Sequence, residues 1–150
     1  MKLKIPPVVQ FLSAAIAMWL IDWRFPQFAV PFAGQYMVSS ALFLSGAAIG
    51  LIAIAEFVRA KTTVNPTDPS KASKLVITGL YKFTRNPMYL GMLLILTGLV
   101  VRLGNPLNIG MLVFFIWFMT EFQIKPEEDG LREKFDGDYD AYCKKVRRWI

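Results

Sequence analysis

Long apolar stretches alternate with short polar segments along the first 124 residues of the chain. Each is close to the length of about 20 mostly apolar residues that a helix needs to cross a bilayer. The pattern predicts four membrane-spanning helices, at about residues 6–21, 32–55, 88–101 and 106–124. A cleaved secretory signal peptide is the alternative for the first stretch, which we expect to be retained as a helix.

The last part of the chain has a different pattern. After Pro126, apolar side chains recur every three or four residues between charged ones, which is typical of an amphipathic helix. We expect this tail helix at about 127–147. Within the polar segment 56–87, residues 62–86 contain two prolines and a glycine, so much of this stretch should be irregular backbone. The predicted fold is a single all-α domain, residues 1–150: an integral membrane protein with four transmembrane helices and a cytosolic amphipathic C-terminal helix.

Two glycines, Gly46 and Gly50, lie four residues apart inside the second predicted span. This spacing allows two helix backbones to approach closely in lipid. We expect them to pack against another helix of the same chain. A homodimer contact and no special role are the alternatives, so both a monomer and a homodimer remain open.

The composition supports a membrane protein. Hydrophobic residues make up 55% of the chain and charged residues 19%, which is more apolar than an ordinary soluble domain of 150 residues. Four spans leave too few residues for a separate soluble catalytic domain. The chain has no histidine and one cysteine, Cys143, which excludes an internal disulfide and a histidine-based triad. No metal site is expected, and Cys143 is expected to be a packing residue.

The net charge of +6 is explained by where the basic residues lie. Fifteen of the 17 lysines and arginines fall in the N-terminus, the 56–87 segment and the 121–150 tail. Such an asymmetry predicts that these segments are cytosolic, with both termini on that side of an inner or cytoplasmic membrane. It also accounts for the charge without nucleic acid, so the expected partner is the lipid bilayer.

The densest run of candidate chemistry lies at the start of the third predicted span. It reads Gly79-Leu80-Tyr81-Lys82-Phe83-Thr84-Arg85-Asn86-Pro87-Met88-Tyr89-Leu90-Gly91. Alone, it is equally compatible with an aromatic belt carrying a lipid-facing arginine and a proline that begins a helix. The tail contains a second run, with Glu127-Glu128 followed by Leu131, Phe135, Tyr139 and Tyr142. Together the two runs resemble the isoprenylcysteine carboxyl methyltransferase family, whose wider group includes phospholipid methyltransferases; the resemblance covers about 60–149.

The resemblance implies an enzyme that takes S-adenosyl-L-methionine from the cytosol and methylates a lipophilic or small hydrophobic acceptor. By position, it implies cofactor contacts at Ser73, Lys74, Leu75, Val76, Tyr81, Asn86, Pro87, Met88, Tyr89 and Glu127. A carboxylate such as Glu127 can accept hydrogen bonds from both ribose hydroxyls and lie near the sulfonium cation. The resemblance thus implies that Glu127 binds the cofactor, and Glu127 is also a catalytic candidate.

Three positions depart from the family pattern. Asn86 stands where the family has histidine, and Gln123 stands where it has a substrate-contacting arginine. Without that cation, a carboxylate substrate loses its natural partner. Arg85 is a candidate to hold a phosphate or carboxylate, so the catalytic candidates are Arg85 and Glu127 and the substrate-binding candidates are Gln123 and Arg85. Asp136 replaces a glycine, with Gly137 following, which predicts a local bend shifted by one residue.

Two other classes of function remain open from the sequence. A non-catalytic membrane scaffold, or a partner-binding subunit that keeps the family fold, is favoured by the three departures. A small transporter is less compatible with the pattern, because the spans contain almost no charged residue to line a path.

Overall fold

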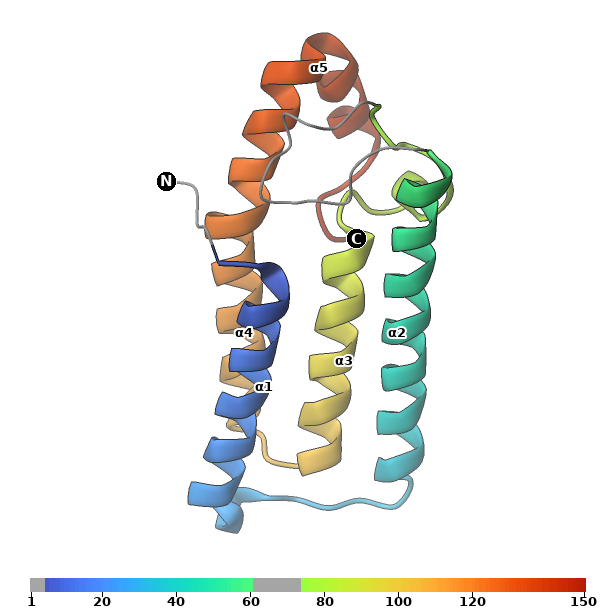
Figure 1. Ribbon diagram of the computed structural model, residues 1–150. Helices are drawn as coiled ribbons and strands as arrows, with labels where there is room; N and C mark the ends of the chain where they lie inside the picture. The colour runs from blue at the N-terminus through green and yellow to red at the C-terminus, as the bar shows by residue number, and fades with distance from the viewer. Residues whose placement is uncertain (1–4, 61–73) are drawn as a thin grey trace.

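The computed structural model describes residues 5–60 and 74–150, and these residues form helices and connecting loops without strands. Four long helices run alternately up and down in a bundle (Figure 1). They are α1 (Pro7–Arg24), α2 (Gln35–Arg59), α3 (Pro87–Leu103) and α4 (Asn108–Met119). Two short 3₁₀ helices, η1 (Pro26–Phe28) and η3 (Gly79–Lys82), lie in the connections. The all-α prediction is confirmed.

The fourth apolar helix does not end where the tail begins. α4 continues through a π-helical segment, η4 (Thr120–Ile124), directly into α5 (Lys125–Lys145). The sequence predicts a boundary near Pro126, because proline lacks an N–H group and disturbs a helix interior. The wider π turn lies immediately before Pro126, and such turns accommodate a changed hydrogen-bond register without ending the helix. The span and the first part of the tail are therefore one continuous helix.

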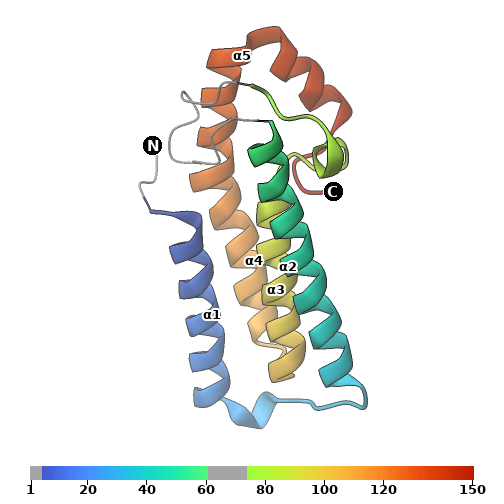
Figure 2. The ribbon, with the colours of Figure 1, turned by 45° about the vertical axis from the view of Figure 1, so that its right-hand side comes forward.

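The bend in α5 lies at Asp136, whose φ is 38° and ψ −121°. Beyond it the helix turns over the end of the bundle (Figure 2). The sequence predicts a bend shifted by one residue, and this prediction is wrong. Asp136 itself adopts a positive φ, in a combination with ψ that is strained for any residue with a side chain, while Gly137 has no positive φ.

Glycines bring α2 and α3 into close contact. A Cβ atom on Gly46 would lie 2.6 Å from the carbonyl oxygen of Gly91, and one on Gly91 would lie 2.6 Å from that of Gly46. Gly91 also faces the backbone of Gly50, with 3.1 Å between the added Cβ and the Gly50 nitrogen. The expected packing of the glycine pair in α2 against another helix of the same chain is confirmed.

Replacing Gly91 by alanine is expected to destabilise the protein by about 1–3 kcal/mol, because the new methyl group forces two packed backbones apart. Gly110→Ala in α4 is the matched control, since a Cβ there meets nothing within 4 Å. Because alanine favours a helix over glycine, the control should be neutral or slightly stabilising. Chemical unfolding in detergent micelles measures both. Equal effects would show that the α2–α3 contact is looser than described.

Much of the outer surface of the bundle is apolar. Large hydrophobic side chains on three helices are strongly exposed, for example Ile16 (59%), Leu44 (72%), Leu51 (68%) and Val113 (62%). Exposed apolar surface on this scale marks a lipid or protein environment rather than water. Two helices are long and apolar enough to cross a membrane, α2 and the continuous helix Asn108–Lys145, and α3 is a shorter apolar helix. These helices indicate a membrane protein.

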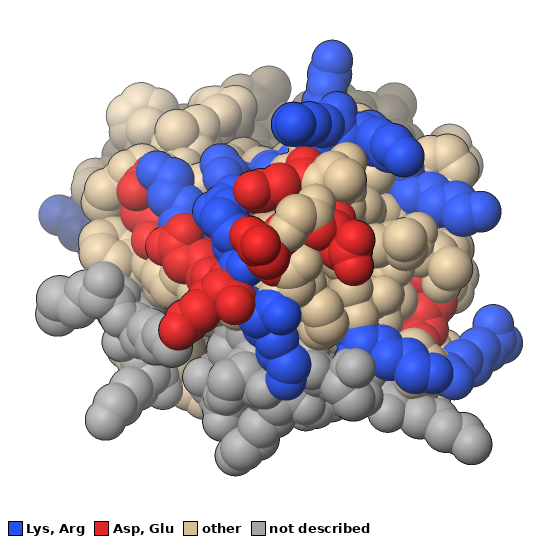
Figure 3. Space-filling model, turned by 90° about the horizontal axis from the view of Figure 1, so that it is seen from above, with Lys and Arg blue, Asp and Glu red and all other residues tan. Residues whose placement is uncertain are grey.

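Charged side chains gather at the end of the bundle that carries α5. Viewed onto this end, lysine and arginine side chains are mixed with aspartate and glutamate (Figure 3). The start of α1, the end of α2, the start of α3 and the C-terminus of the chain all lie toward it (Figure 1). We call it the α5 end; both motif runs meet here.

Candidate functional site

A chain of buried and partly buried hydrogen bonds joins four helical segments at the α5 end. The Tyr89 hydroxyl in the first turn of α3 donates to Glu127 Oε1 at 2.6 Å. The Gln123 side-chain amide donates to the same oxygen, and Gln10 Nε2 of α1 donates to Gln123 Oε1 at 3.1 Å. Gln123 and Glu127 are four residues apart on one continuous helix, so they share a face. We call Gln10, Tyr89, Gln123 and Glu127 the Glu127 network.

The network places a carboxyl group with an unusual proton affinity at this junction. Burial raises the pKa of Glu127 to about 7, and the hydrogen bonds from Tyr89 and Gln123 oppose that rise. The neighbouring Glu128 adds a smaller upward shift in the pKa of Glu127. Glu127 therefore changes protonation near neutral pH. It can pair with a cation when ionised and can take up a proton.

A second cluster surrounds the next residue. The buried Glu128 carboxylate receives two bonds from Arg148, at 3.0 Å from Nε and 2.7 Å from the terminal nitrogen. Arg85 lies 3.2 Å from the same carboxylate and also donates to the Cys143 sulfur. We call Arg85, Glu128, Cys143 and Arg148 the Glu128 cluster. Arg85, predicted to contact a substrate, is thus engaged inside the protein by Glu128.

The C-terminal segment, residues 146–150, folds back along the start of α3. The Arg147 carbonyl accepts from the Arg85 backbone N–H at 3.0 Å, and the Arg148 carbonyl accepts from the Asn86 side chain at 2.9 Å. The Trp149 indole donates to the Thr120 hydroxyl at 3.1 Å in η4. The Asn86 amide therefore bonds to the C-terminal backbone, and the segment fixes the turn that leads into α3.

Three of the remaining predicted cofactor residues pack against α2. Val76, Tyr81 and Met88 pack with Ala53 in one apolar cluster, and Pro87 is buried at the start of α3. Lys74 begins the second described range, and Ser73 lies outside the described residues.

Tyr81 connects this apolar cluster with its surroundings. Its backbone carbonyl accepts from the Tyr142 hydroxyl at 2.6 Å, and its ring makes an edge contact with Phe57. Burial raises the pKa of Tyr81 far above its usual value, and the charges of Glu56, Tyr142 and Glu127 raise it further. Tyr81 therefore lies within electrostatic reach of Glu127.

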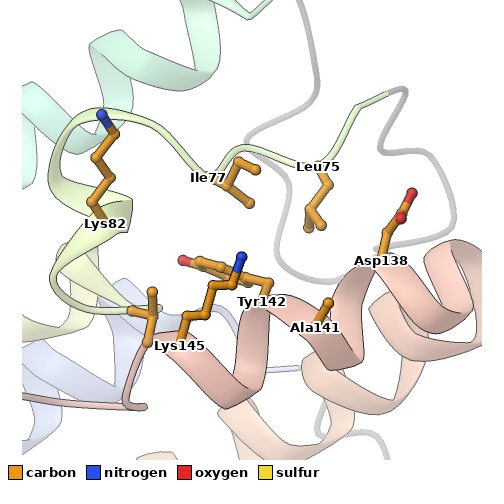
Figure 4. Close-up of a pocket in the computed structure, with 8 residues that line it drawn as sticks. Leu75, Ile77, Lys82, Asp138, Ala141, Tyr142 and Lys145 are labelled. Atoms are coloured by element: carbon orange, nitrogen blue, oxygen red, sulfur yellow. The ribbon is translucent and has the colours of Figure 1, made fainter.

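A cavity of about 630 Å³ opens beside Tyr142, between the 75–82 segment and the second half of α5 (Figure 4). It is lined by Leu75, Ile77, Lys82, Asp138, Ala141, Tyr142, Lys145 and Val146. Of the predicted cofactor residues only Leu75 is among them. No residue of the Glu127 network lines the cavity; Tyr81 bonds to the cavity-lining Tyr142 and is affected by the charge of Glu127.

Four side chains described at the α5 end, Glu56, Glu128, Arg148 and Gln10, lie outside the predicted set. Glu128 and Arg148 form the buried ion pair, and Glu56 of α2 accepts from the Leu80 backbone N–H at 3.0 Å. In the sequence, Glu128 could have been found from its place next to Glu127, and Arg148 from the basic C-terminus. For Gln10, the signal was a single glutamine inside an apolar helix.

The fold and site define a helical membrane protein with a buried carboxylate site at one end of its bundle. A family model described as phospholipid methyltransferase matches residues 34–137, more than two thirds of the chain. The chain belongs to the phospholipid methyltransferase family, which confirms the family resemblance of the two motif runs. The matched range contains α2, α3, α4 and the first part of α5, and leaves out α1 and the C-terminal segment.

A curated relative adds similarity without a function. The chain is 44% identical over 63 residues to a protein of Haemophilus influenzae described as uncharacterized. The match covers 42% of this chain and 100% of that protein. No solved structure matches the chain. The family membership therefore rests on the family model, and it makes the chain a methyltransferase-type membrane protein.

Proposed function

We propose that this protein is a membrane methyltransferase that uses S-adenosyl-L-methionine and methylates a lipophilic acceptor at the cytosolic membrane face. The observation that carries the proposal is the Glu127 carboxyl group, held at the meeting point of α1, α3 and α5 by Tyr89 and Gln123. Family membership supplies the type of reaction, and the network supplies a residue able to bind its cationic cofactor.

The proposed arrangement in the membrane has four spans, with α1 and α3 crossing beside the two longer helices. The exposed apolar side chains of α1, α2 and α4 support it, since lipid is the solvent that such a surface needs. The charged α5 end then faces the cytosol with both chain termini, as the distribution of basic residues predicts. In this arrangement the Glu127 network lies at the depth of the cytosolic headgroups.

The residues at the α5 end fit the proposed cofactor. A volume of about 630 Å³ is within the usual range of small-ligand sites, roughly 300–1,000 Å³. Leu75 and Tyr142 offer apolar and aromatic surface for a base, and Glu127 offers an acceptor for hydroxyl groups and a counter-charge. The hydrogen bonds from Tyr89 and Gln123 both end on Oε1, which fixes the orientation of the carboxylate. We propose that cofactor binding spans the cavity, Tyr81 and Glu127.

For methyl transfer, the protein has mainly to align the acceptor atom with the methyl carbon and sulfur of the cofactor, and to exclude water. When bound, S-adenosylmethionine would supply a methyl group activated by its sulfonium, which the lone pair of the acceptor would take as the electron pair of the carbon–sulfur bond stays on sulfur. Glu127, with a pKa of about 7, can take a proton that the acceptor loses. The buried Tyr89 hydroxyl holds Glu127 in place during that exchange. The Glu128 cluster holds the turn before α3.

One observation favours a second candidate, a non-catalytic scaffold. Arg85 and the Asn86 amide, both predicted to contact ligands, are bonded to Glu128 and to the Arg148 carbonyl. A protein that kept only the fold would need these internal bonds and no cofactor. The two functions differ in whether the purified protein transfers a methyl group.

The test is transfer of tritium from methyl-labelled S-adenosylmethionine to organic-soluble product. The purified protein is incubated with mixed micelles of a total membrane lipid extract, phosphatidylethanolamine or a farnesylated cysteine analogue. We expect labelled product from the wild-type protein with at least one of these acceptors and none from Glu127→Ala. A cooperatively folded wild-type protein that labels none of them would favour the scaffold.

Cofactor affinity is expected to rise with pH up to about 7 and then to level off. Since burial raises the pKa of Glu127 to about 7, the neutral carboxyl dominates in acid and cannot pair with the sulfonium. Below pH 7 the affinity should fall roughly tenfold per pH unit. Calorimetric titrations between about pH 5.5 and 8.5 measure this profile. Glu127→Gln should bind weakly with a flat profile; the wild-type slope persisting in this variant would assign it to another group.

The raised pKa of Glu127 affects the stability of the cofactor-free protein in the opposite direction: stability should fall as the pH rises. The pKa of Glu127 in the folded protein is raised, so its contribution to stability is present in acid and is lost as the pH rises through about 7. Cofactor binding should therefore stabilise the protein most above that pH.

A further inference from the structure

We propose that Gln10 of α1 determines acceptor specificity, and that it selects a lipophilic acceptor whose head group donates a hydrogen bond, such as an amine, over an ionised carboxylate. The inference rests on the proposed methyltransferase function. It concerns a residue outside the range that the family model matches, residues 34–137.

The position of Gln10 is well defined. Its side chain is buried, with the residue 8% exposed, and Nε2 donates both to the Ile5 carbonyl at 3.0 Å and to Gln123 Oε1 at 3.1 Å. Both amide hydrogens are therefore used, and these two acceptors fix which end of the amide is nitrogen. The oxygen, Oε1, is buried and has no hydrogen-bond partner within the described part of the chain.

A buried hydrogen-bond acceptor without a donor is uncommon in a folded protein. Most buried polar atoms have a partner, and a buried atom without one lowers stability unless something else supplies the missing bond. Gln10 also lies in a largely apolar helix, where a buried polar side chain needs hydrogen-bond partners. A donor on a bound ligand would complete the bonding of Oε1.

Gln10 lies on the opposite side of the Glu127 network from the proposed cofactor site. Gln123 connects Glu127 to Gln10 in α1, whereas Tyr81 and the cavity lie toward α2 and η3. Figure 1 shows α1 and α2 on different sides of α3. A methyl acceptor next to Gln10 therefore approaches Glu127 from the side of α1. The side of α2 is then left to the cofactor.

Among the described residues, the hydrogen-bonding atoms of Gln10 and Gln123 leave a hydrogen-bond acceptor free and no donor. Gln123 Nε2 already donates to Glu127, Gln10 Nε2 donates to two carbonyl oxygens, and the free atom is Gln10 Oε1. An ionised carboxylate has no hydrogen to donate and would be repelled by Glu127. An amine head group donates to Gln10 Oε1 and can release its proton to Glu127. The pattern of donors and acceptors thus selects the amine.

The test compares Gln10→Leu with Gln35→Leu. Gln35 is also a buried glutamine, 7% exposed, but bonds to the Arg102 carbonyl at the opposite end of the bundle. For each protein we would measure the Kd of S-adenosylmethionine, the unfolding temperature, and kcat and KM for phosphatidylethanolamine and for a farnesylated cysteine carrying a free carboxylate, both in mixed micelles.

Gln10→Leu is expected to raise the KM for the amine acceptor roughly tenfold, as the loss of one buried hydrogen bond predicts. The Kd of S-adenosylmethionine should change by less than this KM, because Tyr89 still donates to Glu127, and the ratio of amine to carboxylate methylation should fall. Gln35→Leu should change none of these ratios. An unchanged ratio in an active Gln10→Leu protein, or a wild-type preference for the carboxylate, overturns the inference alone. Failure of the wild-type protein to bind the cofactor removes the proposed function and the inference with it.

Discussion

Replacing Glu127 by alanine is expected to weaken the binding of S-adenosylmethionine by at least 30-fold, roughly the 2 kcal/mol that hydrogen bonds to a charged group contribute. The variant removes the acceptor that Tyr89 and Gln123 hold in place, and it removes the negative charge next to the proposed sulfonium position. Tyr89 and Gln123 can then bond to water, so the helices should stay packed. Calorimetry on the detergent-purified protein measures the change in Kd.

The control for this variant is Glu133→Ala. Glu133 lies on the same helix as Glu127 and has an exposed side chain. Its replacement by alanine removes one negative charge, as Glu127→Ala does. It should leave the Kd within about twofold. Equal losses in the two variants would show that general electrostatics, rather than the Glu127 network, attracts the cofactor, and that the site has been placed wrongly.

Glu128→Ala is expected to have the largest effect on stability. Its carboxylate is the counter-charge for both Arg85 and Arg148, and the Arg85 side chain is 11% exposed. Removing one partner of a buried ion pair costs about 3–5 kcal/mol, because a charge is left without compensation. Since the Arg148 side chain is 32% exposed, we expect the lower end of that range. Chemical unfolding in detergent measures the loss.

The effect should reach the site through the C-terminal segment. Arg148 holds that segment on Glu128, and its carbonyl holds the Asn86 side chain before α3. Glu128→Ala should therefore also weaken cofactor binding and expose the C-terminus to carboxypeptidase.

Asp129→Ala provides the comparison at the adjacent position. The Asp129 side chain is 78% exposed, and its pair with Arg132 at 3.4 Å lies on the surface, where ion pairs contribute little. We expect a change in stability below about 1 kcal/mol. A Glu128→Ala protein as stable as Asp129→Ala would contradict the role of the Glu128 cluster.

The apolar stretches predict the long helices well, because hydrophobic length directly determines which segments become helical in lipid. Their ends are less predictable. α2 begins at Gln35, after Gly34 with a φ of 84°, and continues past Glu56 to Arg59. The Glu56 side chain accepts the Leu80 backbone N–H, a contact from a distant segment that supports the extra turn. Local pattern does not contain that information.

The continuous helix through η4 and the bend at Asp136 could not be derived from the sequence. Pro126 and Gly137 are the residues that ordinarily mark a boundary or a bend, and the chain uses neither in that way. The hydrogen-bond register at η4 and the positive φ at Asp136 depend on how the tail packs over the bundle. That packing includes Tyr142 on Tyr81 and Arg148 on Glu128.

For the site, the motif runs correctly bring Tyr89 and Glu127 together, although 38 residues separate them. The resemblance carries this pairing, since two runs at a fixed separation are specific. It says nothing of Gln10 or Arg148, which lie outside the matched range. Both are recruited through long-range contacts, Gln10 to Gln123 and Arg148 to Glu128. The roles predicted for Arg85, Asn86 and the other site residues stay predictions.

The central claim is that the α5 end binds S-adenosylmethionine at Glu127. Calorimetric titration of the wild-type protein with S-adenosylmethionine at about pH 7.5, in detergent and after cooperative unfolding has been verified, tests it most directly. We expect saturable binding of one molecule per chain, displaced by the product S-adenosylhomocysteine. A folded protein that shows no saturable binding would contradict the account.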